Sequence, residues 1–145
     1  MIRFRKTLLV SHSARQMFDL VNDIPSYPEF LPWCSEAVVL EEQGNQKIAR
    51  LGMRYLGLKQ SFSTINLANP PHSLILQLKE GPFRYLKGEW VFSSIDEESC
   101  QIIFSIEYDF DSKLLQKLIG PVFDVITKTL VDAFVKRADK IAAKR

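Results

Sequence analysis

The chain has 145 residues, of which 46% are hydrophobic and 25% charged, and its net charge is +2. This composition excludes a disordered chain, and the length predicts one domain with one core over residues 1–145. No apolar run reaches the roughly 18 residues that a membrane-spanning helix needs. Residues 1–10 alternate apolar and basic side chains, unlike a signal peptide, so we expect a cytoplasmic protein.

The N-terminal third predicts one strand and two short helices. Residues 2–10 alternate like a half-buried strand. Ser13 is a candidate N-cap for a helix over 14–22, which Pro25 ends because proline lacks an amide donor. The next residues, 25–34, place three aromatic side chains among three prolines. Such a segment predicts a stiff helical turn that buries its apolar surface against something.

The remainder predicts a curved antiparallel sheet and a long helix. Short polar turns such as Gly44–Asn45 separate strand-like segments, which favours an antiparallel meander. With residues 2–10 they make about seven strands: 37–42, 47–56, 59–67, 74–78, 85–95 and 102–110. From Lys113 apolar residues recur every three or four positions over about 30 residues, with a kink or break expected at Gly120–Pro121. The fold class is therefore α+β, with the C-terminal helix covering the apolar face of the sheet.

The sequence predicts no catalytic residues, no metal site and no cofactor. His12 and His72 have no partner at metal-ligand spacing, and we expect both at the surface. Cys34 and Cys100 form no CxxC pair and are predicted to be buried free thiols, with a disulfide as the alternative. Phosphate-binding glycine loops and nucleophile elbows are missing from the sequence. A pair of carboxylates meeting across strands remains the alternative that would permit acid–base catalysis.

The aromatic content suggests a binding cavity between sheet and helix, although these residues could also form an ordinary core. The chain has ten Phe, four Tyr and two Trp residues, and ligand cavities are mostly apolar. Polar contacts to a ligand would come from tyrosines, or from arginines of 47–56 if the register turns them inward. The candidates for these contacts are Tyr55, Tyr85, Tyr108, Arg50 and Arg54. The predicted ligand-binding residues are Phe30, Leu31 and Trp33 as a gate, Phe83 and Trp90 as a wall, Phe123 and Ile126 as a lid, and Met53, Tyr55, Phe62 and Phe104 as further lining.

Positive charge is concentrated near the C-terminus. Residues 111–145 hold eight Lys or Arg residues and four acids, a balance that favours RNA or an anionic lipid surface. The alternative is a solvated helix face. The candidate ribosome or RNA contacts are Lys128, Lys136, Arg137 and Lys140. Transient contact with a membrane surface is also expected, and DNA is not an expected partner.

Three blocks resemble a known family. Residues 21–34 are similar to the VNDxxxYPxFLPxC signature of the coenzyme Q-binding, START-like (polyketide cyclase/dehydrase-like) family. Residues 80–90 resemble its GPFxxLxGxW block, and 122–138 its C-terminal helix. The resemblance implies the helix-grip (START/Bet v 1-like) fold, in which a sheet grips the last helix.

The family resemblance implies two activities. Eukaryotic members resemble lipid chaperones that bind ubiquinone and support respiration. Bacterial members of the ribosome association toxin type bind the large ribosomal subunit and block subunit joining. We therefore expect a non-catalytic protein that holds a hydrophobic small molecule such as ubiquinone or another isoprenoid lipid. The alternative is a ribosome-binding translation inhibitor, and the third candidate is a polyketide cyclase or dehydratase-like enzyme, because START-like relatives include these.

Overall fold

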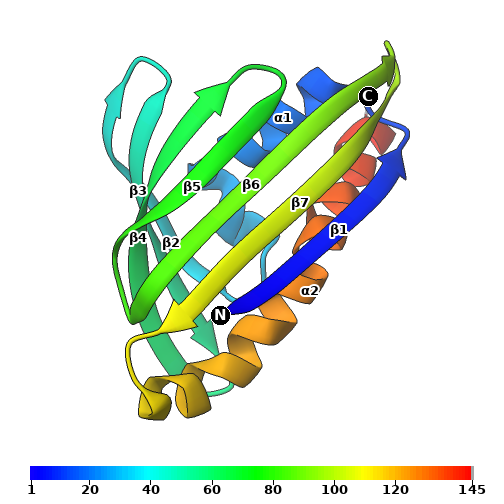
Figure 1. The fold of residues 1–145 in the computed structure, drawn as a ribbon. Helices are drawn as coiled ribbons and strands as arrows, with labels where there is room; N and C mark the ends of the chain where they lie inside the picture. Colours follow the sequence, from blue (N-terminus) through cyan, green and yellow to red (C-terminus); the bar gives the residue numbers. More distant parts are fainter. Residues whose placement is uncertain (145) are drawn as a thin grey trace.

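The computed structural model describes residues 1–144 and confirms the predicted α+β class. A seven-stranded antiparallel sheet, in the order β1-β7-β6-β5-β4-β3-β2, carries the helices on one face (Figure 1). The elements are β1 Ile2–Val10, α1 Ala14–Asn22, the 3-10 helix η1 Ile24–Glu29, β2 Cys34–Gln43, β3 Gln46–Tyr55, β4 Leu58–Asn69, β5 Ser73–Glu80, β6 Phe83–Asp96, β7 Ser99–Phe110 and α2 Lys113–Ala143.

The sheet is a meander whose last strand pairs with the first. β2 to β7 follow one another as neighbours, and β1 adds to β7 with Ile2 opposite Tyr108 and Val10 opposite Cys100. Every second residue of β7 from Cys100 to Phe110 is buried, as the strict alternation of this segment predicts. The inner face of β7 therefore forms the centre of the core under α2.

Local sequence signals place the first helices. The Ser13 hydroxyl accepts a hydrogen bond from the Gln16 amide at 3.1 Å, and the Gln16 side chain accepts one from the Ser13 amide at 2.8 Å. This reciprocal capping box starts α1 at the predicted residue. In η1, the Tyr27 hydroxyl donates to the Val21 carbonyl, so the proline-rich turn is tied back onto the end of α1.

Of the two outcomes predicted at Gly120–Pro121, a kink or a break, the break does not occur: α2 is continuous with Pro121 inside it. Pro121 has no amide hydrogen to donate to the Lys117 carbonyl one turn earlier. Both residues are exposed, so water can satisfy that carbonyl. Figure 1 shows the first turns of α2 running across the end of the sheet before the axis turns along it, which agrees with the expected kink. No helix among residues 1–144 is long and apolar enough to cross a membrane.

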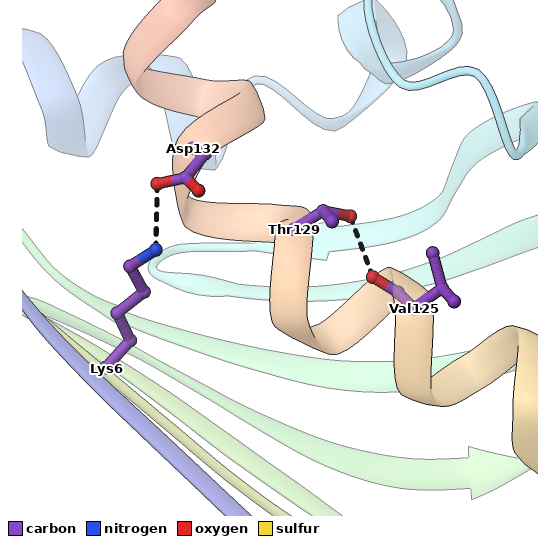
Figure 2. A network of polar contacts seen from close by, with 4 residues as sticks. All are labelled: Lys6, Val125, Thr129 and Asp132. Carbon is purple, nitrogen blue, oxygen red and sulfur yellow. Dashed lines mark hydrogen bonds and ion pairs between the residues drawn. The ribbon is translucent and has the colours of Figure 1, made fainter.

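Two side chains of the β1 region hold α2 to the edge of the sheet. The prediction of a surface position was wrong for His12, which is 8% exposed and has its Nε2 2.6 Å from the Asp139 carboxylate. Lys6 reaches from β1 to Asp132 at 2.9 Å (Figure 2). These contacts exist because the end of β1 passes beside the C-terminal half of α2.

The remaining histidine and the two cysteines lie where the sequence predicts them. His72 is exposed in the turn before β5. Cys34 and Cys100 are buried and free. Burial raises the pKa of each thiol to about 11, so both thiols stay protonated at neutral pH.

Candidate ligand-binding cavity

Two aromatic clusters fill the space between the sheet and α2. The first lies where β7 ends and α2 begins: Phe123 is 4.7 Å from Tyr108 and 4.9 Å from Phe83, measured between ring centroids. The second surrounds Phe134, whose ring lies 5.3 Å from both Tyr27 and Trp90. Such edge-on and tilted pairs stabilise the packing beyond the area they bury.

A cavity of about 80 Å³ lies between the two clusters. It is enclosed by the inner face of the sheet, the segment around η1 and the middle of α2. Its lining residues are Ile24, Tyr27, Leu31, Trp33, Ala49, Leu51, Phe62, Thr64, Asn66, Leu76, Leu86, Trp90, Phe104, Ile106, Phe123, Ile126, Thr127, Leu130 and Phe134. The volume is below the several hundred Å³ typical of ligand pockets, so the cavity is largely closed in this state.

The cavity brings together most of the predicted ligand contacts. Those that line it are Leu31, Trp33, Phe62, Trp90, Phe104, Phe123 and Ile126. Four other predicted residues do not reach it. Met53 is fully buried at the Cys34 end of β3, Tyr55 is half-buried at the end of the same strand, and Phe83 stacks on Phe110 at 5.1 Å. Phe30 is half-buried outside the cavity, with its ring 5.1 Å from that of Phe134 and under the guanidinium of Arg137.

The polar groups of the cavity are not the predicted ones. The register of β3 turns Ala49 and Leu51 inward, so Arg50 points away and pairs with Glu36 at 2.7 Å. Arg54 is exposed for the same reason. The other predicted groups also miss the cavity: Tyr85 is 38% exposed, Tyr108 is buried in the first aromatic cluster, and Tyr55 lies at the end of β3.

Three neutral polar side chains line the cavity instead. The Thr64 hydroxyl donates to the Asn66 amide oxygen at 2.6 Å. Thr127 donates to the Asp124 carbonyl at 3.0 Å. The Thr64 contact occupies the Asn66 amide oxygen, and the amide nitrogen is the part of this side chain that can donate to a ligand.

Thr64 and Asn66 come from a strand whose sequence pattern predicts the opposite orientation of its two faces. Thr64 and Asn66 on β4 are 4% and 7% exposed, whereas Leu67 is 40% exposed and Ile65 only half-buried. Alternation alone favours the opposite orientation, with Ile65 and Leu67 in the core. Polar inward positions on an otherwise apolar face are typical of a site kept for binding, and this reversal is the signal that could have identified Asn66.

The lining offers no acid–base group that titrates near neutral pH. Tyr27 is the titratable residue in it, and burial, then the nearby Cys34 and Asp23, raise its pKa far above the ordinary value. Within residues 1–144 no three His, Cys, Asp or Glu side chains gather in a way that could hold a metal ion. The lining as a whole is mostly apolar, with a few neutral polar side chains.

The predicted ribosome-contact residues divide into two kinds. Lys128 pairs with Asp124, and Arg137 is largely structural: it pairs with Glu29 at 3.1 Å and its guanidinium carbon lies 5.3 Å from the centre of the Phe30 ring. Lys136 and Lys140 are exposed and form no ion pair within the described part of the chain. With Arg137 they line an outer groove between α2 and the segment after η1, together with Glu29, Phe30, Pro32, Trp33, Thr129, Asp132 and Ala133.

The fold and cavity agree with the comparisons to known proteins. The chain belongs to the family described as polyketide cyclase / dehydrase and lipid transport, whose model matches residues 10–135. It is 39% identical over 136 residues to the ribosome association toxin RatA of Vibrio cholerae, covering 94% of each chain.

Two further proteins are more distantly similar. The coenzyme Q-binding protein COQ10 homolog B of Xenopus laevis is 27% identical over 148 residues, which cover 99% of this chain and 61% of that protein. The ZhuI aromatase/cyclase of Streptomyces has a TM-score of 0.84 at 15% identity, covering 96% of this chain and 94% of that one. The last comparison supports the helix-grip architecture alone.

Proposed function

We propose that the chain is a non-catalytic binding protein that holds an apolar quinone or isoprenoid ligand in the cavity. The observation that carries the proposal is the inward position of Asn66 on β4 in a lining that is mostly apolar. A ring carbonyl would accept a hydrogen bond from the Asn66 amide, while the hydrocarbon part contacts the aromatic side chains. The COQ10-named relative adds support, since its name describes binding of coenzyme Q.

The two tryptophans make the proposal directly measurable. The chain has two tryptophans, and both line the cavity, Trp33 at the η1 side and Trp90 on β6. A short-tailed benzoquinone that enters the cavity will quench their fluorescence in a saturable way. Native mass spectrometry of the freshly purified protein provides the second measurement. Linear quenching, matching that of free tryptophan, together with an empty mass spectrum would refute quinone binding.

Asn66→Leu tests the polar contact. Loss of one hydrogen bond should weaken quinone binding by roughly three- to tenfold, while a pure isoprenoid hydrocarbon should bind at least as well. The matched control is Leu67→Asn, because Leu67 lies on the opposite face of the same strand. Equal loss of quinone and hydrocarbon binding in Asn66→Leu would show that the amide has no specific role.

Contact with the large ribosomal subunit is the second candidate. The supporting observation is the outer groove, where the exposed Lys136 and Lys140 lie beside the aromatic residues of the η1 segment. The RatA-named relatives point to the same partner. Both activities can coexist, because the groove lies on the outside of α2 and the cavity on its inside.

Sedimentation with purified large subunits tests this candidate. Lys136→Glu combined with Lys140→Glu should abolish co-sedimentation at low salt, because contacts with RNA phosphates depend on cations. Arg137 is left intact since its reversal would disturb Glu29 and Phe30. Lys87→Glu, an exposed position on β6 away from the groove, is the control. Unchanged co-sedimentation of the double variant would exclude the groove as the contact.

A cyclase or dehydratase activity is the less favoured alternative. General acid–base catalysis needs a group that can exchange a proton with the bound substrate. Tyr27, the titratable residue in the cavity lining, uses its hydroxyl to donate to Val21 and has a strongly raised pKa. This arrangement favours binding over proton transfer.

We also propose that the chain acts as one domain and is located in the cytoplasm.

A further inference from the structure

The turn between β3 and β4 holds a leucine in an unfavourable conformation. Leu56 and Gly57 both have positive φ, 50° and 82°. Glycine and asparagine tolerate this left-handed region, whereas a leucine does not favour it. The side chain of Leu56 is nevertheless 86% exposed, so it gains nothing from burial in this chain. The Leu56 side chain is therefore available for a contact outside the chain.

Leu56 lies at the same end of the molecule as the start of α2. Ser63 of β4 pairs with Glu80 at the end of β5, and Phe110 at the end of β7 pairs with Phe83 at the start of β6. The first residues of β4, and the turn before them, therefore project at the end where β7 passes into α2. Figure 1 shows the β3–β4 turn and the first turns of α2 at that end.

The first turns of α2 add two more exposed leucines. Leu114 is 65% exposed and Leu118 is 57% exposed, one helical turn apart on the same side of α2. We call Leu56, Leu114 and Leu118 the tip surface. Single exposed apolar residues are ordinary, but these three leucines, from the β3–β4 turn and from α2, are exposed at the same end of the molecule. Exposed apolar side chains that project together suit insertion into an apolar phase.

Unpaired cations surround the tip surface. Arg54 and Lys59 flank the β3–β4 turn, and Lys113 and Lys117 lie beside the leucines of α2. All four are exposed, and within residues 1–144 none forms an ion pair, although Asp111 lies near the start of α2. Apolar side chains rimmed by cations match the interface of an anionic bilayer, with hydrocarbon below and phosphates around it.

We propose that the tip surface docks the protein on an anionic membrane surface. The three leucines enter the boundary between head groups and acyl chains, and the four cations contact lipid phosphates. This docking does not depend on which molecule occupies the cavity. Its failure would leave the proposed ligand binding untouched, because vesicle binding is measured with ligand-free protein.

Co-sedimentation of the full chain with lipid vesicles tests the proposal. The protein should bind phosphatidylcholine vesicles that contain phosphatidylglycerol, should bind pure phosphatidylcholine weakly, and should dissociate as salt is raised. Leu56→Asn and Leu114→Ser should each weaken binding roughly tenfold, since each removes one inserted side chain. Asn is chosen at position 56 because it suits the turn, so lost binding cannot come from unfolding.

The chain provides a matched control for leucine loss. Leu9 is 67% exposed and pairs with Gln101 near the start of β7, at the opposite end of the sheet. Leu9→Ser should bind vesicles like the parent chain. Lys113→Glu with Lys117→Glu should remove the preference for anionic vesicles, and Lys87→Glu should not.

Three results would overturn the proposal. The first is a parent chain that stays in the supernatant with both vesicle types at low salt. The second is equal loss of binding for Leu9→Ser and Leu56→Asn. The third is a dimer in sedimentation velocity that Leu56→Asn dissociates, because the tip surface would then be a contact between copies of the chain.

Discussion

Replacement of Leu56 by Asn should stabilise the protein. Leu56 has a φ of 50° and is 86% exposed, so the substitution removes a conformational penalty without removing a core contact. The left-handed region costs an L-residue about 1–2 kcal/mol, and Asn tolerates it better because its side chain bonds locally. We expect a gain of about 1 kcal/mol in the free energy of unfolding. With an m-value near 2 kcal/mol/M, the urea midpoint should rise by about 0.5 M.

The assay is urea unfolding followed by the fluorescence of the buried Trp33 and Trp90. Leu56→Ala serves as the control, because alanine keeps the Cβ that makes the left-handed region unfavourable, and its midpoint should stay within about 0.2 M of the parent. A Leu56→Asn midpoint at or below that of the parent would refute the reasoning. Equal stabilisation by Ala and Asn would also refute it, since loss of an exposed apolar side chain would then explain the effect.

Three further predictions concern the core, the thiols and the edge of the sheet. Phe134→Ala should lower stability by about 3–5 kcal/mol in urea unfolding, because Phe134 is 1% exposed at the centre of the second aromatic cluster. Cys34 and Cys100, with pKa values raised to about 11, should resist alkylation at pH 8 until urea unfolds the chain. The stability that the two thiols contribute should be constant below about pH 8 and fall toward pH 11, because the unfolded thiols deprotonate first. Lys6→Met should cost less than about 1 kcal/mol, since the Lys6–Asp132 pair of Figure 2 is partly exposed; a larger loss would mean that this pair fixes the position of α2.

Local pattern predicted most of the fold. The capping box at Ser13 starts α1 where the sequence placed it, and the alternation of 102–110 faces the core as expected. These predictions succeed because capping and alternation depend on residues within a few positions of one another. The sequence left open whether Pro121 kinks or breaks α2, because the outcome depends on whether solvent reaches the neighbouring carbonyl, which the sequence does not reveal.

The site was predicted less completely because its geometry depends on long-range pairing. The partner of His12, Asp139, lies 127 residues away in the chain, and no spacing rule connects them. Arg137 looked like a surface cation, but the η1 segment folds over it and gives it Glu29 and Phe30 as partners. Asn66 was missed because the polar and apolar faces of its strand are exchanged relative to the usual pattern.

The position of Phe62 connects the cavity to the tip surface. β4 begins directly after Leu56–Gly57 and carries Phe62 and Asn66 on its inner face. Phe62 lies 6.3 Å from Phe123 of α2, and both rings line the end of the cavity nearer the tip surface. A cavity of about 80 Å³ must expand to take a quinone with a tail. We expect β4 and α2 to separate at these two rings when such a ligand binds, which would open the cavity toward the end that we propose meets the membrane.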